Sequence, residues 1–178
     1  MTELDIVRAV QSWFPGTVGR LFVWFAARWL IFFYAPLAAA TGWRKHRSAF
    51  RHAAYEAAWS GLLAFTVAMI MERFTERLRP FAASPDVVAL IHQPSTYSLP
   101  SAHAAIAFAI ATALARAHPL LGIAAFLIAI LVAFGRVAAG VHYPSDVLAG
   151  ALLGVACAFA VRIARKEWSR RRPLAKIS

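Results

Sequence analysis

Two arginines, two histidines and one aspartate stand in short motifs whose chemistry suits the transfer of a phosphoryl group. Arg79 precedes a proline, His103 closes the tetrapeptide Pro-Ser-Ala-His, and the stretch GRVAAGVHYPSD holds Arg136, His142 and Asp146. Arginine offers a forked, permanently charged donor that fits phosphate oxygens. Because His142 and Asp146 are four residues apart, we expect the carboxylate to hold one imidazole nitrogen and to leave the other as a nucleophile.

The start of the apolar run after Pro100 supplies further groups for an anion. Ser101 is expected to cap a helix, so that free backbone N–H groups of the first turn, including that of Ala102, point toward a bound anion. His103 lies in the same turn and can protonate a leaving oxygen near neutral pH. We expect neither a metal ion nor another cofactor. The predicted site comprises the catalytic residues His142, His103 and Asp146 and the phosphate-binding residues Arg79, Ser101, Ala102 and Arg136.

The elements that must position these residues are membrane helices. Hydrophobic residues make up 61% of the 178-residue chain and the mean hydropathy is +0.61, which is too apolar for a soluble domain, where roughly half is usual. Long runs with few charges approach the ~20 residues that a span needs. We expect an all-α polytopic membrane helix bundle of about five transmembrane helices, over residues 20–41, 53–73, 101–117, 119–135 and 145–165.

The two ends of the chain differ from this apolar body. The mixed, amphipathic start predicts an interfacial helix within residues 1–18, and residues 167–178 form a basic tail after a membrane domain over residues 19–166. We expect the tail to be explained by topology and by anionic lipid, and we expect no nucleic-acid partner. The sequence predicts no oligomeric state.

Basic residues predict the orientation of the bundle. The formal net charge is +11, and twelve of the 19 Lys and Arg residues lie in the link 42–52, at Arg116 and from Arg162 to the C-terminus. With five spans these three regions fall on one side, which the positive-inside rule makes cytoplasmic. We therefore expect a multi-pass protein of the cell membrane with a cytoplasmic C-terminus and with the three motifs on the outer face.

The three motifs, in this order and at these intervals, resemble the pattern of the type 2 phosphatidic acid phosphatase superfamily. The family pattern is KxxxxxxRP, then PSGH, then SRxxxxxHxxxD, and the corresponding stretches here are ERFTERLRP, PSAH and GRVAAGVHYPSD. The resemblance covers about residues 53–165. It implies that His142 forms a phosphohistidine, that Asp146 orients His142, and that His103 acts first as an acid and then as a base. It further implies metal-free chemistry, with the phosphoryl oxygens bound by Arg79, Ser101 and Arg136.

Three positions depart from the family pattern. Glu72 stands where the family has lysine, Ala102 where it has glycine, and Gly135 where it has serine. The first change reverses a charge that should touch phosphate, the second adds a methyl group near the anion, and the third removes a hydroxyl donor. Arg73 and Arg77 are the nearby basic residues that a small helix rotation could bring to the lysine position. Because both histidines, the aspartate and both motif arginines remain, the departures concern affinity and substrate more than reaction type.

The small build and the stretch GVHYPSDVLAG look like bacterial undecaprenyl-diphosphatases of this superfamily. The expected function is hydrolysis of a lipid phosphate, with undecaprenyl diphosphate converted to the monophosphate and the head group recognised by residues 81–99. A phosphatidylglycerophosphate or phosphatidate phosphatase would use the same residues, as would a phosphotransferase if an alcohol replaced water. A non-catalytic lipid-binding membrane subunit is the alternative of another class, and Glu72 with the two lost polar contacts favours it.

Overall fold

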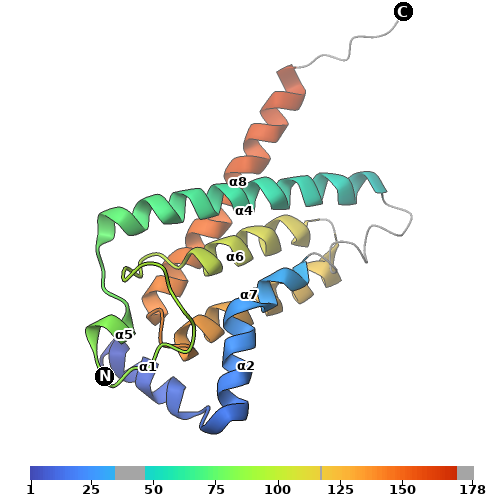
Figure 1. Cartoon of the computed structure of the whole chain (residues 1–178). Coiled ribbons are helices and arrows are strands. Elements are labelled where there is room, and N and C mark those ends of the chain that lie inside the picture. The colour runs from blue at the N-terminus through green and yellow to red at the C-terminus, as the bar shows by residue number, and fades with distance from the viewer. Residues whose placement is uncertain (35–46, 117, 172–178) are drawn as a thin grey trace, which may run out of the picture.

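The computed structural model describes residues 1–34, 47–116 and 118–171, and over these ranges it is built of helices, turns and loops without a strand (Figure 1). The all-α prediction is confirmed. In chain order the elements are α1 (Glu3–Ser12), α2 (Gly16–Arg28), the 3-10 helix η1 (Leu30–Phe33), α4 (Arg47–Thr75), α5 (Pro80–Ala83), α6 (Ala102–Ala115), α7 (Pro119–Ala138) and α8 (Pro144–Arg171). Within the described ranges, α4, α7 and α8 are long and apolar enough to cross a membrane, and α6 is a shorter apolar helix.

Helix α6 forms the centre of the bundle and contacts α4, α7 and α8. All but two of its buried residues are alanines, and such small side chains let neighbouring helices approach closely. The closest approach is to α8, where a Cβ added at Gly150 or Gly154 would collide with the carbonyl oxygens of Ser101 and Ala105. The α6–α8 contact therefore depends on small residues on both helices, and it brings the starts of these helices together.

The first predicted span, residues 20–41, differs from the structure. Helix α2 ends at Arg28, a 3-10 turn follows, and the last part of the predicted span lies outside the described residues. The break coincides with aromatic crowding, because the ring of Trp29 lies 6.0 Å from that of Trp24 and 5.7 Å from that of Phe32. Bulky aromatic side chains lose rotamer freedom in an α-helix, which favours an irregular turn here.

The tighter turn carries Tyr34 into the bundle. Its hydroxyl lies 3.1 Å from the carbonyl oxygen of Ala107 and 2.9 Å from that of Ala125. The side chain is buried among residues of α4, α6 and α7. The segment after α2 is thus fixed to the middle of α6 and α7, although it is not one continuous helix.

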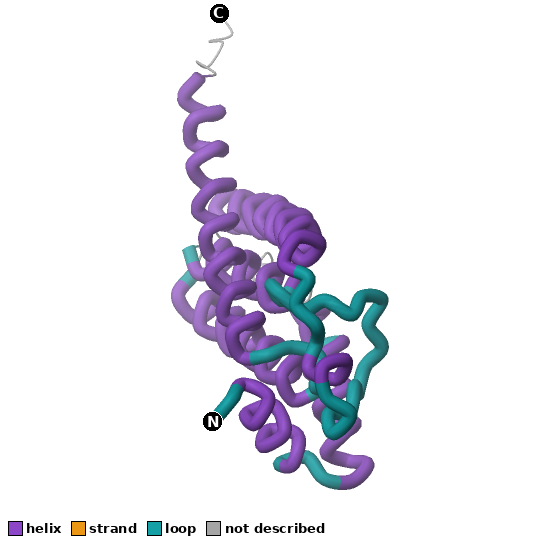
Figure 2. Tube along the Cα trace, turned by 90° about the vertical axis from the view of Figure 1, so that its left-hand side faces the viewer, coloured by secondary structure: helices purple, strands orange, loops and turns teal. Residues whose placement is uncertain are grey.

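Helix α1 confirms the predicted helix at the amphipathic start of the chain, and it packs against the end of the bundle that carries the three motifs. Val7 and Val10 are buried, and Arg8 donates to the Ser84 hydroxyl and the Asp86 carboxylate, both at 3.0 Å. Figure 2 shows α1 and the long loop gathered at this end, away from the C-terminus. The motif loops are therefore covered by a helix from the chain start.

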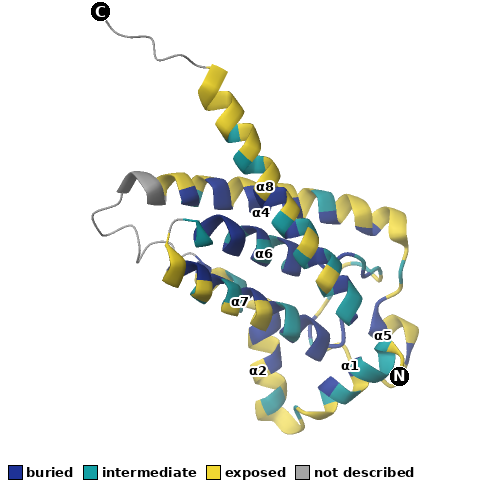
Figure 3. Cartoon of the chain, turned by 180° about the vertical axis from the view of Figure 1, so that it is seen from behind, coloured by how far each residue is buried: buried dark blue, intermediate teal, exposed yellow. Residues whose placement is uncertain are grey.

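The opposite end of the bundle carries the basic residues. Helix α8 has 28 residues, and at 1.5 Å per residue it is about 42 Å long, longer than the ~30 Å hydrocarbon core of a bilayer. Its last turns are exposed (Figure 3). Arg116 and the start of α4 lie at the same end, as the charge pattern predicts. Arg44 and Lys45 of the predicted link lie outside the described residues, as do residues 172–178 of the predicted tail.

Candidate active site

His142 lies at the centre of the candidate site, in the loop between α7 and α8, and is only 2% exposed. Its Nδ1 is 2.9 Å from the carbonyl oxygen of Ser98, which can only accept, so Nδ1 carries a proton. Its Nε2 is 2.9 Å from Nη1 of Arg79 and 3.4 Å from Nη2 of Arg136, and guanidinium nitrogens only donate. The partners therefore select the tautomer that has a lone pair on Nε2.

The surroundings of His142 also set its charge. Burial lowers the pKa of His142 well below its usual value, and the guanidinium groups of Arg136 and Arg79 lower it further. The hydrogen bond to the Ser98 carbonyl acts in the opposite direction without reversing the shift. The ring is therefore neutral at neutral pH, which is the state that a nitrogen nucleophile requires.

Asp146 is fully buried but is not the nearest partner of the imidazole. Its Oδ2 lies 3.6 Å from His142 Nδ1, too far for a hydrogen bond, and accepts from the backbone N–H of Tyr143 at 2.8 Å. In a capping box, the side chain of the third helical residue accepts a hydrogen bond from the backbone N–H of the N-cap residue. Asp146 and Tyr143 form this bond at the start of α8, and it draws the carboxylate toward the helix terminus. The expected carboxylate–imidazole hydrogen bond is thus replaced by the Ser98 carbonyl, and Asp146 holds the loop that carries His142.

Three oxygen acceptors hold Arg79, in addition to Nε2 of His142. Its Nε donates to the carbonyl oxygen of Ser95 at 2.8 Å, its Nη1 to that of Val141 at 3.0 Å, and its Nη2 to Oε1 of Glu72 at 3.0 Å. Glu72 is itself only 7% exposed. The acidic residue at the family's lysine position is therefore the counter-ion of Arg79, and it fixes the direction in which the guanidinium group faces His142.

Arg77 connects α1 to the site. Its Nη1 donates to Oδ1 of Asp146 at 2.8 Å and its Nη2 to Glu3 at 2.6 Å. Glu3 also accepts from the backbone N–H and the hydroxyl of Ser145, at 2.8 and 2.9 Å. Burial alone would raise the pKa of Glu3, but the hydrogen bonds from Arg77 and Ser145 outweigh it and lower the pKa. Because Arg77 is engaged and Arg73 is exposed, neither takes the place of the family lysine.

Arg136 is 2% exposed and joins α7 to two distant segments. Its Nη1 donates to the carbonyl oxygen of Ala27 at 3.2 Å, and its Nη2 to Oε1 of Gln93 at 3.0 Å. The adjacent Gly135 makes this docking possible, because a Cβ there would lie 2.9 Å from the backbone nitrogen of Ala27. The serine hydroxyl of the family pattern is thus exchanged for a close approach of α2, which supplies a carbonyl to Arg136.

Ser101 and His103 occupy the start of α6, beside the same cluster. The Ser101 hydroxyl makes no capping hydrogen bond, while the Ser101 N–H donates to the backbone oxygen of Asp146 at 3.0 Å. The next amides, beginning with that of Ala102, have no acceptor within the helix. His103 is half-buried and lies close enough to His142 and to both motif arginines to interact with them electrostatically. The structure thus brings all seven predicted site residues to one end of the bundle.

The assembled groups suit a tetrahedral anion. Four buried side-chain polar atoms lack a hydrogen-bond partner in the described part of the chain, and Ser101 Oγ and Arg136 Nε are two of them. Such atoms are uncommon in native proteins and indicate a polar ligand when they face one site. No group of three His, Cys, Asp or Glu side chains among the described residues is placed to hold a metal ion. The arrangement can hold a phosphoryl group against the lone pair of His142.

Several contributors to the site were not predicted from the sequence. Ser95 and Ser98 act through backbone carbonyls, which carry no sequence signature. Gln93 lies in the loop expected to read the head group, but it binds Arg136 instead. Arg28 ends α2 close enough to Arg136 and His103 to interact with them electrostatically. Arg28 could have been predicted from the sequence, because an arginine within an apolar run is a candidate functional residue.

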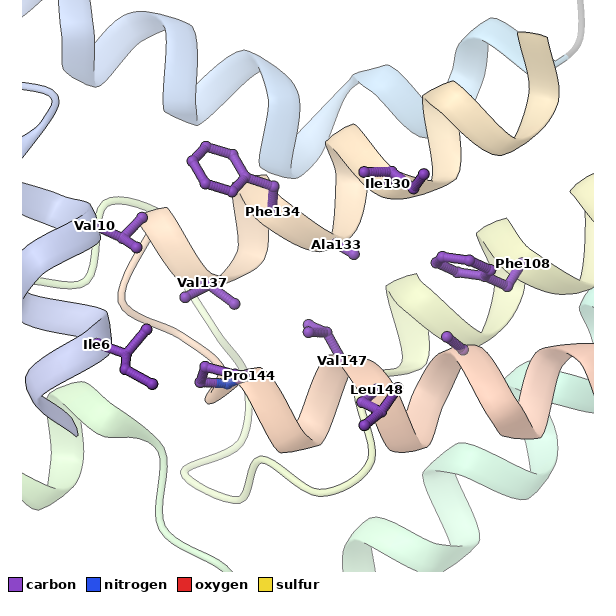
Figure 4. A pocket seen from close by; sticks show the side chains of 11 residues that line it. Ile6, Val10, Phe108, Ile130, Ala133, Phe134, Val137, Pro144, Val147 and Leu148 are labelled. Atoms are coloured by element: carbon purple, nitrogen blue, oxygen red, sulfur yellow. The ribbon is translucent and has the colours of Figure 1, made fainter. Parts of the chain in front are cut away.

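An apolar groove of about 400 Å³ lies on another face of α7 (Figure 4). Ile6 and Val10 of α1, Val137 of α7 and Val147 of α8 line it. Whereas Val137 faces the groove, the neighbouring Arg136 reaches α2 and the long loop. The groove and the histidine cluster therefore occupy different faces of α7, and α1 closes one end of the groove.

Comparison with known proteins identifies the family. The protein-family model described as "PAP2 superfamily" matches residues 53–170, a range that contains all three motifs. The chain belongs to the PAP2 superfamily. Members of this superfamily are phosphatases, so the chain is an enzyme of a phosphatase family. Helices α1 and α2, which supply Glu3 and the Ala27 carbonyl to the site, lie before the matched range.

Individual relatives agree with this assignment. The chain is 33% identical over 139 residues to the bacitracin transport permease protein BcrC of Bacillus licheniformis, a match that covers 78% of this chain and 68% of the relative. It is 37% identical over 101 residues to an undecaprenyl-diphosphatase of Sulfolobus acidocaldarius, which covers 52% of this chain and 48% of that relative. The second match thus spans about half the length of each protein.

A solved structure extends the likeness beyond the family range. The crystal structure of Aquifex aeolicus LpxE superposes with a TM-score of 0.68 at 25% sequence identity, and the match covers 90% of this chain and 94% of that chain. Part of the chain before residue 53 is therefore shared as well. The two proteins therefore share the same helical fold.

Proposed function

We propose that this PAP2 enzyme hydrolyses undecaprenyl diphosphate to the monophosphate through a phosphohistidine on His142, without a metal ion. The observation that carries the proposal is the tautomer of His142, whose Nε2 lone pair faces the guanidinium groups of Arg79 and Arg136. The nucleophilic nitrogen Nε2 therefore lies beside two guanidinium groups that can bind the phosphate oxygens. The similarity to a protein named undecaprenyl-diphosphatase supports the choice of substrate.

The first step transfers the terminal phosphoryl group to the enzyme. The oxygens of this phosphoryl group accept hydrogen bonds from the guanidinium N–H groups that face Nε2 in the structure. They also accept from the Ser101 hydroxyl and from the first-turn amides of α6. The Nε2 lone pair attacks phosphorus, and the bond from phosphorus to the bridging oxygen breaks. His103 donates a proton to the departing lipid monophosphate, while the Ser98 carbonyl keeps hold of the Nδ1 proton.

The second step returns the enzyme to its starting state. His103, now neutral, removes a proton from water. The water oxygen attacks phosphorus, the N–P bond breaks, and inorganic phosphate leaves with the Nε2 lone pair restored on His142. Glu72, Arg77 and Asp146 keep the arginine and the histidine loop in place throughout.

The proposed site faces the outside of the cell membrane, and the C-terminus faces the cytoplasm. The basic residues of α8 and Arg116 support this orientation, because they gather at the end of the bundle opposite His142. The positive-inside rule places such an end in the cytoplasm. A diphosphate carried on a lipid would then be hydrolysed at the outer leaflet.

The test is phosphate release from undecaprenyl diphosphate, phosphatidylglycerophosphate and phosphatidate in the presence of EDTA. We expect the wild type to be active with the chelator and to have the highest kcat/KM on the diphosphate. His142→Ala should lower kcat by about 10³-fold or more, whereas His92→Ala, which changes an exposed histidine of the long loop, should leave kcat unchanged.

Each part of the proposal fails on a different outcome. Turnover by His142→Ala would remove the nucleophile assignment, and loss of wild-type activity in EDTA would remove the metal-free chemistry. Faster hydrolysis of phosphatidylglycerophosphate or phosphatidate would show that the proposed substrate is wrong, while the proposed reaction mechanism would stand. A folded wild type that is inactive on every lipid would favour a non-catalytic lipid-binding subunit.

A further inference from the structure

A second cluster of basic side chains lies at the end of the bundle opposite His142. A cavity of about 240 Å³ opens where the start of α4, the end of α6 and the later turns of α8 meet. One water occupies roughly 30 Å³ of liquid, so the cavity has room for a tetrahedral anion. Its charged and titratable lining consists of His52, Glu56, Arg116, Arg162, Arg165 and Lys166.

Glu56 is the one acid in this lining, and it is already paired. It is 5% exposed and accepts from Arg116 Nη2 at 2.7 Å and from Arg165 Nε at 2.6 Å. Four basic side chains therefore surround one carboxylate, which leaves a net charge of +3 when His52 is neutral. Arg162 and Lys166, which are four residues apart on α8, make no ion pair within the described ranges.

Arg116 contributes a donor that none of the described residues uses. Its Nη1 is buried and has no hydrogen-bond partner among the residues that the structure describes. The Phe159 ring lies 5.8 Å from the guanidinium carbon, and Glu56 holds Nη2, so the side chain is fixed from two sides. A fixed, buried donor beside an excess of positive charge indicates an anionic acceptor from outside the chain.

We propose that this cavity binds the phosphate group of an anionic phospholipid. A phosphate accepts from several guanidinium donors at once, and basic pockets between membrane helices bind lipid head groups in this way. A lipid is favoured over free phosphate because Tyr55, Phe159 and Ile163, from the same turns of α4 and α8, are exposed apolar side chains along which acyl chains can lie. The site shares no residue with the candidate active site.

The test measures which lipids the purified protein retains. Wild type and variants are reconstituted in vesicles of phosphatidylcholine and phosphatidylglycerol, extracted in mild detergent, and analysed for bound lipid by native mass spectrometry. The double variant Arg162→Gln/Lys166→Gln removes two charges from the cavity. The matched control Arg170→Gln/Arg171→Gln removes two charges from the same helix outside the cavity.

We expect wild type and the control to retain phosphatidylglycerol in preference to phosphatidylcholine, and the cavity variant to lose this retention at least fivefold. An equal loss in both double variants would assign the effect to diffuse surface charge and overturn the proposal. So would equal retention of the two lipids by the wild type. A third arm adds inorganic phosphate to lipid-free micelles, and if saturable phosphate binding appears there while no phosphatidylglycerol is retained, the ligand is free phosphate and the lipid assignment is wrong.

Discussion

A neutral imidazole beside two guanidinium groups is the central feature at the scale of single residues. Its Nδ1 proton is held by the Ser98 carbonyl, and its Nε2 faces Arg79 and Arg136. Both cations disfavour a third positive charge, and burial disfavours it as well. The same groups that would bind the phosphoryl oxygens therefore keep the nucleophile unprotonated.

The first prediction concerns the titration of His142. Because burial and the two arginines lower its pKa, we expect the ring to stay neutral as the pH falls through about 6.5, the ordinary imidazole value. In protein labelled with ¹⁵N-histidine, the signals that disappear in His142→Gln should keep the shifts of a neutral Nδ1–H ring below that pH. Their titration near the ordinary value would contradict the geometry.

The same shift makes a signed contribution to stability. Below pH 6.5 or so the unfolded chain binds a proton at residue 142 that the folded chain excludes. The folded-state pKa of His142 is lowered, so this group destabilises the fold progressively as the pH falls, and the effect is absent above that range. His142→Gln should therefore reduce the acid sensitivity of thermal unfolding relative to the wild type.

Glu72 is the residue whose role changes most between sequence and structure. Glu72→Gln keeps an acceptor for Arg79 but removes the charge, and we expect kcat/KM to fall about tenfold. Glu72→Lys restores the family residue, but it breaks the buried Glu72–Arg79 ion pair and places a lysine beside Arg79. Breaking a buried ion pair costs about 3–5 kcal/mol. We expect Glu72→Lys to lower the unfolding temperature and to reduce kcat/KM by more than about 10²-fold.

The exposed Glu76, in the same segment, provides the control, and Glu76→Gln should resemble the wild type in both measurements. If Glu72→Lys were as active as the wild type, Glu72 could not be the counter-ion that orients Arg79. Residue positions at this scale were predictable from the sequence in part, since the structure brings the seven predicted site residues to one end of the bundle. Their partners were not, because Ser95 and Ser98 contribute only carbonyl oxygens.

At the scale of elements, the approach of α2 to α7 depends on Gly135. A Cβ at this position would lie 2.9 Å from the Ala27 nitrogen, whereas a Cβ at Gly61 would make an ordinary 3.4 Å contact with Ile110. We therefore expect Gly135→Ala to push α2 away, to weaken the Arg136–Ala27 hydrogen bond, and to lower both the unfolding temperature and kcat/KM.

Gly61→Ala is the matched control. Gly61 is buried, but a Cβ there would make only ordinary van der Waals contacts with Ile106 and Ile110, so we expect an unfolding temperature close to that of the wild type. Thermal unfolding in detergent measures both variants. An unfolding temperature for Gly135→Ala equal to that of Gly61→Ala would mean that α2 is not fixed through this contact.

Helix α1 is fastened to the site through Glu3 and to the long loop through Arg8. Glu3→Gln should weaken the Glu3–Arg77 ion pair and with it the support of Asp146, so we expect kcat to fall several-fold with little change in KM. Asp86→Asn weakens α1 docking through Arg8 only, and it should leave kcat near the wild-type value. Equal kcat values in the two variants would show that α1 acts only as an anchor.

Elements were predictable where one physical signal dominates. Hydropathy places the ends of α4, α6, α7 and α8 to within six residues, and the amphipathic start of the chain predicts α1. The same signal fails after α2, because an apolar run says nothing of the aromatic crowding around Trp29. Close helix contacts through Gly135 also escape hydropathy, since they depend on which backbone lies opposite.

At the scale of the whole molecule, the two ends of the bundle carry different sets of polar residues. One end holds His103, His142, the buried arginines and the loops under α1, and the other holds the basic residues around Glu56. The charge excess that the composition shows is therefore largely separate from the candidate catalytic site. The match to Aquifex aeolicus LpxE over 90% of this chain indicates that this arrangement of helices is shared.

The most direct test of the proposed chemistry is to trap the phosphoryl-enzyme. The protein is mixed with undecaprenyl diphosphate labelled with ³²P in the terminal phosphate, quenched in alkaline detergent, which preserves N–P bonds, and mapped by mass spectrometry. We predict label on His142 in the wild type and none in His142→Ala, and in His103→Ala both slower formation and slower loss of the label, because His103 serves both steps. Label on any other residue, or phosphate release by His142→Ala, would contradict the assignment.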